Sequence, residues 1–325
     1  MIDEEMTARL LHLVGMRPDV PADRESRVKK AFLDEVRATA HARVVRRRIA
    51  TVAAALSMAA AAVVAIWLGV SREVARPVVT VVATVERLEG DGVRQNGSSE
   101  PVRIALGDPV HLGDRIDSGT TGRVGLRLAN GASLRFDHGS RARLVSLNSF
   151  ALDAGAVYVD SGSESPALEV ATSFGIVKDV GTQFEIRLGD SSLRVRVRSG
   201  VVEVHRGGDV SSARPGTELT VTTTLAISRS VVPYGQEWAW AVSLGPRFDI
   251  EGRPLSAFLE YVCREQGWTL VYTDSKLALE ASGIVLHGST QGLQPSDALA
   301  IVMATTGLTH RVADGELEVA RAVRP

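Results

Sequence analysis

The strongest pattern along the chain is an apolar run at residues 49–70, which contains no charged residue and directly follows Arg46, Arg47 and Arg48. At a rise of about 1.5 Å per residue, a helix over this run would be about 33 Å long and could cross a hydrocarbon core of roughly 30 Å. A soluble amphipathic helix would carry a polar stripe, which this run lacks. A signal peptide normally has a short charged region, whereas 48 residues precede this run,. We therefore expect an uncleaved transmembrane helix over 49–70.

Basic residues next to a membrane span favour the cytoplasmic side. The three arginines therefore predict a cytoplasmic head, residues 1–48, and external domains after residue 70. In a bacterium with two membranes this means one pass through the inner membrane and a periplasmic C-terminal part. Apolar residues at helical spacing predict two helices in the head, over 3–14 and about 23–45,. Their apolar stripe fits either a partner-binding face or a helix pair that packs on itself or on the membrane.

The hydrophobic period changes from 3.6 to 2 over residues 78–232, where short alternating runs are separated by Gly, Asn, Asp and Ser,. This pattern predicts an all-β domain. A three-residue turn, Ala129 to Gly131, would pair Leu126 with Leu134 and give the hairpin one apolar face, with Gly131 in the left-handed position of a bulge. By the same test, a two-residue turn at Ser199-Gly200 would pair Val197 with Val202.

A connector, residues 233–246, follows the β-rich region and contains Trp238 and Trp240. These side chains share a face only if the connector is a strand. They fit packing between two domains or, alternatively, a partner-docking surface.

Residues 247–325 predict a small α+β domain of order βαββαββ. The expected strands are 247–252, 268–274, 283–292 and a hairpin that turns at Asp314-Gly315,. The expected helices begin at Pro254 and Gln294 and end at Gly267 and Gly307. The single cysteine, Cys263, falls on the buried side of the first helix, so we expect an inert thiol and no disulfide framework,.

The composition gives no sign of catalysis, of a cofactor or of direct nucleic-acid binding. The formal net charge is −1 and the pI is about 6.7. The chain has no nucleophile elbow, phosphate loop, dinucleotide motif or zinc-protease motif. The histidines, which lack ligand spacing, are His12, His41, His111, His138, His205, His287 and His310. Asp108 and Asp114 flank a Pro-to-Gly segment and are explained by turn formation. We therefore predict no catalytic, cofactor-binding or metal-binding residues.

Several motifs in the β-rich region resemble, in order and spacing, the FecR domain of iron-uptake regulators. They are residues 113–116, 128–134, 155–159, 170–172, 180–184 and 197–202. The resemblance covers roughly residues 80–220 and implies a periplasmic domain of a transmembrane signalling protein.

The C-terminal domain resembles the short N-terminal domain of secretins and TonB-dependent proteins. The matching segments are 248–262, 267–272, 286–292, 296–299 and 306–311. This resemblance implies a module that docks other proteins across the periplasm, such as an outer-membrane transporter or a secretin.

Together these features predict an inner-membrane, anti-sigma-like regulator of the FecR type. It would couple a periplasmic or outer-membrane partner to a cytoplasmic extracytoplasmic-function sigma factor bound by residues 1–48. The head departs from the family because it contains no tryptophan. The alternative is a membrane-tethered periplasmic scaffold of an envelope complex with no role in transcription. A polysaccharide-binding module is a third interpretation, which lacks an aromatic platform in the sequence.

Overall fold

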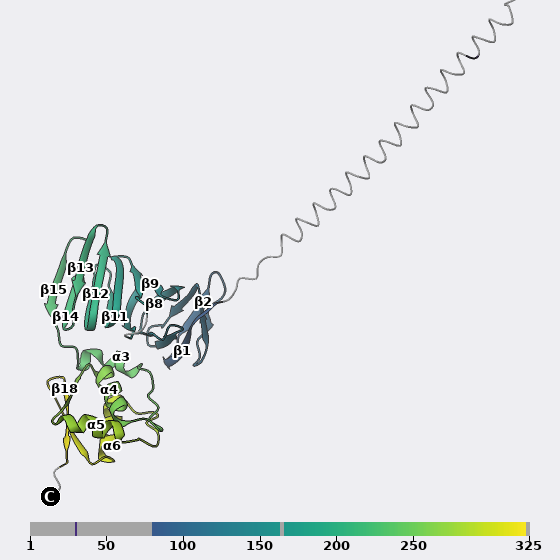
Figure 1. Ribbon diagram of the computed structural model, residues 1–325. Helices are drawn as coiled ribbons and strands as arrows, with labels where there is room; N and C mark the ends of the chain where they lie inside the picture. The colour runs from purple at the N-terminus through teal and green to yellow at the C-terminus, as the bar shows by residue number, and fades with distance from the viewer. Residues whose placement is uncertain (1–29, 31–79, 163–165, 323–325) are drawn as a thin grey trace, which may run out of the picture. The chain divides into compact units, whose positions relative to one another are not determined.

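The computed structural model, shown in Figure 1, describes residue 30, residues 80–162 and residues 166–322. Apart from residue 30, the predicted helices of the head and the apolar run at 49–70 lie outside these ranges. Within the described ranges, no helix combines the length and the apolar character needed to cross a membrane. Residues 79–325 form a compact unit of their own.

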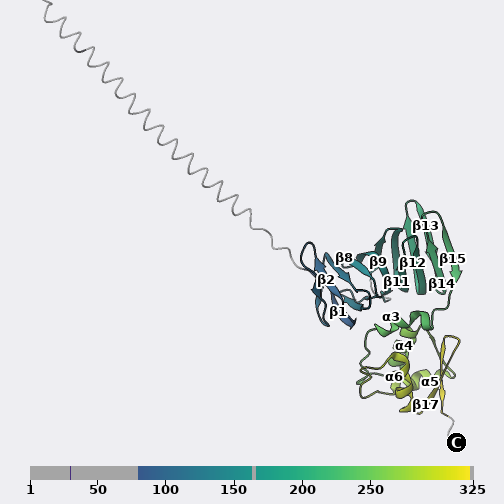
Figure 2. The same cartoon turned by 180° about the vertical axis from the view of Figure 1, so that it is seen from behind.

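The N-terminal part of this unit is built from fifteen strands, which confirms the predicted all-β domain. The strands are β1 Val81–Glu89, β2 Val93–Asn96, β3 Val102–Arg103, β4 Pro109–His111, β5 Asp114–Asp117, β6 Arg123–Leu128, β7 Ser133–Phe136, β8 Arg141–Ser146, β9 Ser149–Asp160, β10 Glu169–Thr172, β11 Gly175–Leu188, β12 Leu193–Arg206, β13 Asp209–Ala213, β14 Thr217–Val221 and β15 Ala226–Ser230. Figures 1 and 2 both draw β1, β2 and β8 at the opposite end of the domain from β13 and β15.

The strands form one continuous sheet that folds back into two layers. The three long strands β9, β11 and β12 take part in both layers. The first layer contains β4, β1, β6, β7, the C-terminal halves of β9 and β11, the N-terminal half of β12, β14 and β15. The second layer contains β3, β2, β5, β8, β10, β13 and the remaining halves of the long strands. Each long strand passes between the layers near a glycine with positive φ: Gly155 (80°), Gly181 (66°) and Gly200 (78°).

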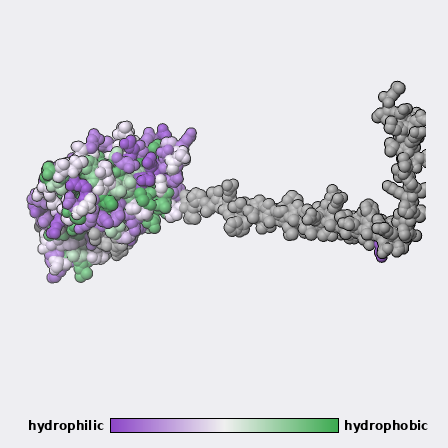
Figure 3. Space-filling view, turned by 90° about the horizontal axis from the view of Figure 1, so that it is seen from above, coloured by the Kyte–Doolittle hydropathy of each residue, from purple (hydrophilic) through white to green (hydrophobic). Residues whose placement is uncertain are grey.

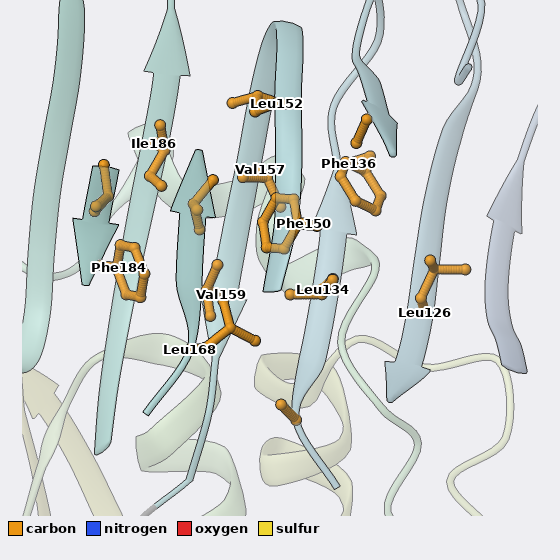
Figure 4. Close-up of a cluster of buried hydrophobic side chains, with 14 of the residues drawn as sticks. Leu126, Leu134, Phe136, Phe150, Leu152, Val157, Val159, Leu168, Phe184 and Ile186 are labelled. Atoms are coloured by element: carbon orange, nitrogen blue, oxygen red, sulfur yellow. The ribbon is translucent and has the colours of Figure 1, made fainter. Parts of the chain in front are cut away.

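The core of the β domain lies between the two layers. Phe136 of the first layer meets Phe150 of the second edge to face, with ring centroids 6.1 Å apart. Figure 4 shows side chains from β6, β7, β9 and β11 directed into this interior. The predicted hairpin register is confirmed, since Leu126 pairs with Leu134 and Gly131 has φ of 91°.

The predicted hairpin at Ser199-Gly200 is wrong. Val197 pairs with Phe184 and Val202 with Asp179, so both residues belong to one long strand, β12, that runs beside β11. The turn between these strands lies at residues 189–192, where the Gly189 N–H donates to Ser192 O at 2.9 Å. Gly200 is where β12 changes layers. The change uses a glycine with positive φ beside a polar residue, and because hairpin turns use the same residue types, the local sequence resembles a turn.

The C-terminal domain is α+β, but its element order differs from the predicted βαββαββ. It contains α4 Leu255–Gln266, β16 Thr269–Tyr272, α5 Ser275–Gly283, α6 Pro295–Ala304, β17 Leu308–Ala313 and β18 Glu316–Arg321. The three strands form a sheet of order β16-β18-β17. The predicted register of the last hairpin is confirmed, since Val312 pairs with Leu317 and Arg311 with Glu318.

Two strands predicted for this domain, 247–252 and 283–292, are wrong. These segments approach one another at Gly252 and Leu286, whose N–H and C=O groups are 2.9 Å apart, but the ladder stops at a single bridge between Pro254 and Val285. Helix α5 was not predicted, although Asp274 caps it by accepting the Lys276 N–H at 2.9 Å.

The predicted helix ends are right at one position and wrong at another. Gly267 follows α4 in the left-handed conformation, as expected. Helix α6 ends at Ala304, before Gly307, because the hydroxyls of Thr305 and Thr306 donate to the carbonyls of Val302 and Met303.

Candidate functional site

The face of the first layer that points away from the core carries a row of directly opposed residues across eight strands. From β1 to β15 the row consists of Arg87, Gly125, Arg135, Tyr158, Glu185, Arg196, Glu218 and Arg229. We call it the cross-strand row. The strand period of two places these residues outward because their chain neighbours face the core. Opposite charges alternate along its second half, an arrangement that favours pairing between neighbouring strands.

The middle of the cross-strand row is buried, although it is charged, because the connector and α4 cover it. Arg135 and Tyr158 are fully buried, and Glu185, Arg196 and Glu218 are nearly so. The connector forms η1 Gln236–Trp238 and α3 Ala239–Ser243 on this face. The face therefore joins the β domain to the C-terminal domain.

A bidentate ion pair between Arg135 and Glu265 lies at the centre of this junction. The two guanidinium nitrogens of Arg135 donate to the two carboxylate oxygens of Glu265 at 2.7 and 2.9 Å. Arg135 also donates to Ala241 O, in the middle of α3, at 2.8 Å. Burial opposes the charge on Arg135, but Glu265 outweighs it and holds the pKa of Arg135 above its usual value,. Removing one member of such a pair leaves a buried, uncompensated charge, at a cost of about 3–5 kcal/mol.

Arg198, on the same face of β12, binds the C-terminal end of α4. Its guanidinium donates to Glu265 O at 2.8 Å and lies 4.5 Å from the centroid of the Trp238 ring. A cation at this end is favoured because the last carbonyls of a helix lack intrahelical partners and carry partial negative charge.

A second ion pair, between Arg264 and Asp160, extends the junction along β9. Arg264 Nε donates to Asp160 Oδ2 at 3.0 Å, and a second guanidinium nitrogen binds the other carboxylate oxygen. Gln183 donates to the same Asp160 oxygen at 3.0 Å and to Arg264 O at 3.3 Å. The last turn of α4 is therefore held by three neighbouring side chains of the β domain and by Arg135.

The close approach requires glycine at residue 267. A Cβ atom on Gly267 would lie 2.1 Å from Pro233 O in the connector, and the residue has φ of 71°. Both the space and the backbone conformation exclude other residues without local rearrangement.

The connector contributes the aromatic part of the junction. Its two tryptophans lie on helical turns, so they do not share a face as strand residues would. Trp238 is buried edge to face against Tyr158, at 6.0 Å between centroids, and donates to Val232 O at 3.1 Å. Glu237 binds Arg196 at 2.6 Å. For Trp238, packing at the domain junction is therefore the interpretation that the structure supports.

Among the described residues considered for chemistry in the sequence, His111 and Asp114 lie together, with His111 Nδ1 3.4 Å from a carboxylate oxygen of Asp114. The described part of the chain contains no group of three possible metal ligands. His138, His205 and His287 each contact one carboxylate, namely Asp137, Glu203 and Glu251. Asp108 and Asp114 accept backbone N–H groups within their turns, as predicted. His12 and His41 lie outside the described residues.

Cys263 is buried on α4, in agreement with the sequence prediction. Burial, together with the nearby Glu260 carboxylate, raises the pKa of its thiol to about 12. The thiolate that would act as a nucleophile is therefore disfavoured at neutral pH. The junction binds one domain to another, and its described groups are arranged for that role.

Residues 114–203, from β5 through most of β12, match the family described as FecR protein. This part of the β domain is similar to the FecR domain. The match confirms this part of the resemblance found in the sequence, and it includes Arg135, Tyr158, Asp160, Glu185 and Arg198 of the junction. The resemblance of residues 247–325 to the secretin and TonB short N-terminal domain stays a prediction.

Other comparisons add little to the FecR assignment. Two crystal structures of a candidate anti-sigma factor from Parabacteroides distasonis ATCC 8503, at 2.50 and 1.65 Å, align over 64% of this chain and 99% of theirs. Their sequence identity to this chain is 18% and the TM-score is 0.35, which is too low to support a conclusion about fold or function. Among curated proteins none matches.

The sequence did not single out the residues of the junction. Arg135 and Glu265 are 130 positions apart, and each has an ordinary local pattern. An arginine that points outward from a strand is normally solvated. The burial of Arg135 is therefore recognised only once the structure shows that α4 covers it. The one usable signal is the alternation of basic and acidic outward residues on β11, β12 and β14, which appears only when their register is known.

Proposed function

We propose that this protein is a single-pass regulator of the bacterial inner membrane that couples a periplasmic or outer-membrane partner to a cytoplasmic sigma factor. The FecR domain supports the class of regulator. The apolar run at 49–70 and its preceding arginines support the anchor and its orientation,. In this arrangement the FecR domain and the C-terminal domain are periplasmic and residues 1–48 are cytoplasmic.

The observation that carries the proposal is the buried junction between the FecR domain and the C-terminal domain. A partner can transmit a signal only if its affinity differs between two arrangements of the protein. The Arg135–Glu265 pair and the arginine-bound end of α4 provide a defined closed arrangement. A partner that binds the C-terminal domain better in an open arrangement would shift the FecR domain away from it.

The cytoplasmic output in this proposal is the capture or release of a sigma factor by the head. The apolar stripes of the two predicted head helices supply a binding face. Because the head lacks the tryptophans typical of FecR-type heads, the proposed surface is built from aliphatic side chains and Phe32. The proposed role is regulatory and non-enzymatic.

The test is capture of partners by the full-length chain. A C-terminally tagged chain is purified in mild detergent from its own cells, beside a matched chain that lacks residues 1–48. We expect a sigma factor to co-purify with the first and not with the second. A known anti-sigma regulator that captures its own sigma factor in parallel is the positive control.

Two outcomes would contradict the proposal. If neither chain captures a sigma factor while the control does, the head has no such partner. If both chains capture the same secretin or transport components and no sigma factor, the protein is a periplasmic scaffold.

A further inference from the structure

The described chain begins at one end of the FecR domain, where three turns meet. The N–H of Leu112, between β4 and β5, donates to Thr80 O at 2.9 Å, and the neighbouring Gly113 N–H donates to Leu144 O at 2.8 Å. Asn130, in the β6–β7 turn, donates to Leu147 O at 3.2 Å. These hydrogen bonds bring the β4–β5, β6–β7 and β8–β9 turns next to the start of β1.

Four large apolar side chains at this end are exposed to solvent. Their exposed fractions are 48% for Val81, 46% for Leu112, 49% for Val145 and 46% for Leu147. We call these four residues the tip. Figure 3 shows hydrophobic residues scattered among polar ones on one face of the molecule, and single exposed residues of this kind are ordinary,. The tip differs because its members lie on adjoining segments linked by hydrogen bonds, and grouped apolar surface marks an interaction site.

Unpaired positive charge adjoins the tip on the second layer. Arg143 lies two residues before Val145 on the same face of β8 and is directly opposite Arg115 of β5. Within the described ranges, no hydrogen bond or ion pair reaches the side chain of either arginine. Like charges directly opposed on a sheet are destabilising, so this pair favours an external anion.

Two carboxylates near this pair are bound to other cations. Asp114 is fully buried and binds Arg94, and Glu169 binds Lys178 at 2.7 Å. Asp117 accepts the Gly119 N–H at 2.8 Å. Asp117 and the exposed Asp153 also lie on this face, but Arg115, Arg141 and Arg143 outnumber them, so the net local charge is positive.

The length of chain before the tip identifies the surface that is within reach. Nine residues, 71–79, separate the end of the apolar run from Thr80. A segment of this length spans at most about 30 Å. If the run crosses the inner membrane, the tip lies no farther than this from the outer leaflet of that membrane.

We propose that the tip rests on the periplasmic surface of the inner membrane, with its apolar side chains among the lipid headgroups and Arg115 and Arg143 bound to anionic lipid phosphates. This inference rests on the membrane anchor of the proposed function. Apolar burial and attraction to anionic lipid are each weak alone, and together they hold a protein on a membrane. The contact fixes the orientation of the FecR domain on the membrane. A movement of the C-terminal domain is then a movement relative to a FecR domain that is held in place.

The proposal is tested with the full-length chain in lipid nanodiscs. An environment-sensitive dye is placed at Leu147→Cys in a Cys263→Ser background, and its quenching by lipid-attached quenchers is measured with and without phosphatidylglycerol in phosphatidylcholine. The matched control carries the dye at Ile227→Cys on β15, which is exposed to 59%. We expect quenching of the tip dye, stronger with phosphatidylglycerol, and none of the control dye.

Substitution of one arginine separates lipid binding from chance proximity. At about 1 kcal/mol per arginine near an anionic surface, Arg143→Gln should lower the equilibrium for tip docking about fivefold. Arg214→Gln, an exposed arginine before β14, should leave it unchanged. Equal effects of the two substitutions would overturn the role of Arg143.

The remaining outcomes distinguish this inference from the proposed function. A chain that carbonate washing extracts from native membranes has no anchor, which overturns both. A chain that stays anchored while the tip dye remains unquenched overturns the lipid contact alone. A tip dye that is shielded only after periplasmic extract is added assigns the tip to a protein and also overturns the lipid contact.

Discussion

The arginines on the two outer faces of the β domain lie in opposite environments. On the first layer, Arg135 and Arg196 are buried, and each lies against a carboxylate. On the second layer, Arg115 and Arg143 are exposed and face each other. The same strand pattern, with apolar residues inward and charged residues outward, produces both faces. What differs is whether another segment among the described residues covers them.

The comparison shows where burial of charge is tolerated. Desolvation of a guanidinium costs several kcal/mol unless a carboxylate and hydrogen bonds compensate it. On the covered face Arg135 and Arg196 each have such a carboxylate in place, from α4, the connector or a neighbouring strand, whereas the buried Arg198 is compensated by carbonyls at the end of α4 and by the Trp238 ring. On the open face solvent compensates the charge, so the sheet needs no covering element. A face with unpaired arginines is then available to an external partner.

The largest effect is expected for a substitution at the centre of the covered face, the outer face of the first layer. Glu265→Ala leaves Arg135 buried without its carboxylate. It should lower the free energy of unfolding of the protein by about 3–5 kcal/mol. The measurement is urea denaturation followed by tryptophan fluorescence, since Trp238 lies at the junction. Glu260→Ala, an exposed position on the same helix, is the control and should change stability by less than about 0.5 kcal/mol.

A double substitution sharpens this prediction. Arg135→Met combined with Glu265→Leu removes both charges and keeps most of the volume, so it should recover most of the lost stability. A double variant as unstable as Glu265→Ala alone would mean that packing, and not the buried charge, determines the loss.

The next effect concerns the close approach of α4 to the connector. Gly267→Ala introduces a Cβ atom 2.1 Å from Pro233 O and should destabilise the protein by about 2–4 kcal/mol, the sum of left-handed strain and overpacking,. Gly252→Ala is a matched control because Gly252 has nearly the same φ, 68°, and open space around it. Thermal unfolding of both variants isolates the steric part. Equal losses of stability in the two variants would show that the junction rearranges locally to make room for the Cβ atom.

A smaller effect is the acid sensitivity of the covered face. Burial disfavours the charged form of Glu218, but hydrogen bonds from Arg229 and Arg196 outweigh it and lower its pKa,. A lowered pKa contributes stability above the unfolded value of about 4.3 and loses it as the pH falls toward the folded value. Stability measured from about pH 7 to about pH 3 should therefore fall less steeply in Glu218→Gln than in wild type. Thr220→Ala, on the same strand, should shift the curve without changing its slope.

The sequence predicted features that depend on neighbouring residues and missed those that depend on distant ones. The β6–β7 register followed from Leu126, Leu134 and one local turn. The supposed turn at Ser199-Gly200 failed because its polar residues mark a change of layer, which no short window reveals. The run of Gly189, Asp190 and two serines, between two alternating segments, was the stronger turn signal.

The candidate site was the least predictable part. Arg135 and Glu265 each sit in a regular local pattern, and only the docking of α4 on β7 and β9 brings them together. Pairwise contacts of this separation leave no trace in one sequence. The buried thiol of Cys263 was predictable because the helical stripe around it is local.

The smallest effect tests the open face with two substitutions on one strand. Arg143→Glu replaces a like-charge pair with Arg115 by an opposite-charge pair and should raise the free energy of unfolding by about 0.2–1 kcal/mol in lipid-free protein. Arg141→Glu makes the same change of charge on the same face of β8, but its partner across the strands is Asp117, so stability should fall by a similar amount,. Because net charge changes equally, the opposite signs can come only from the cross-strand partner. Shifts of the same sign in both variants would mean that the positive field of the open face is general, and that the opposition of Arg115 and Arg143 has no special cost for an anion to relieve.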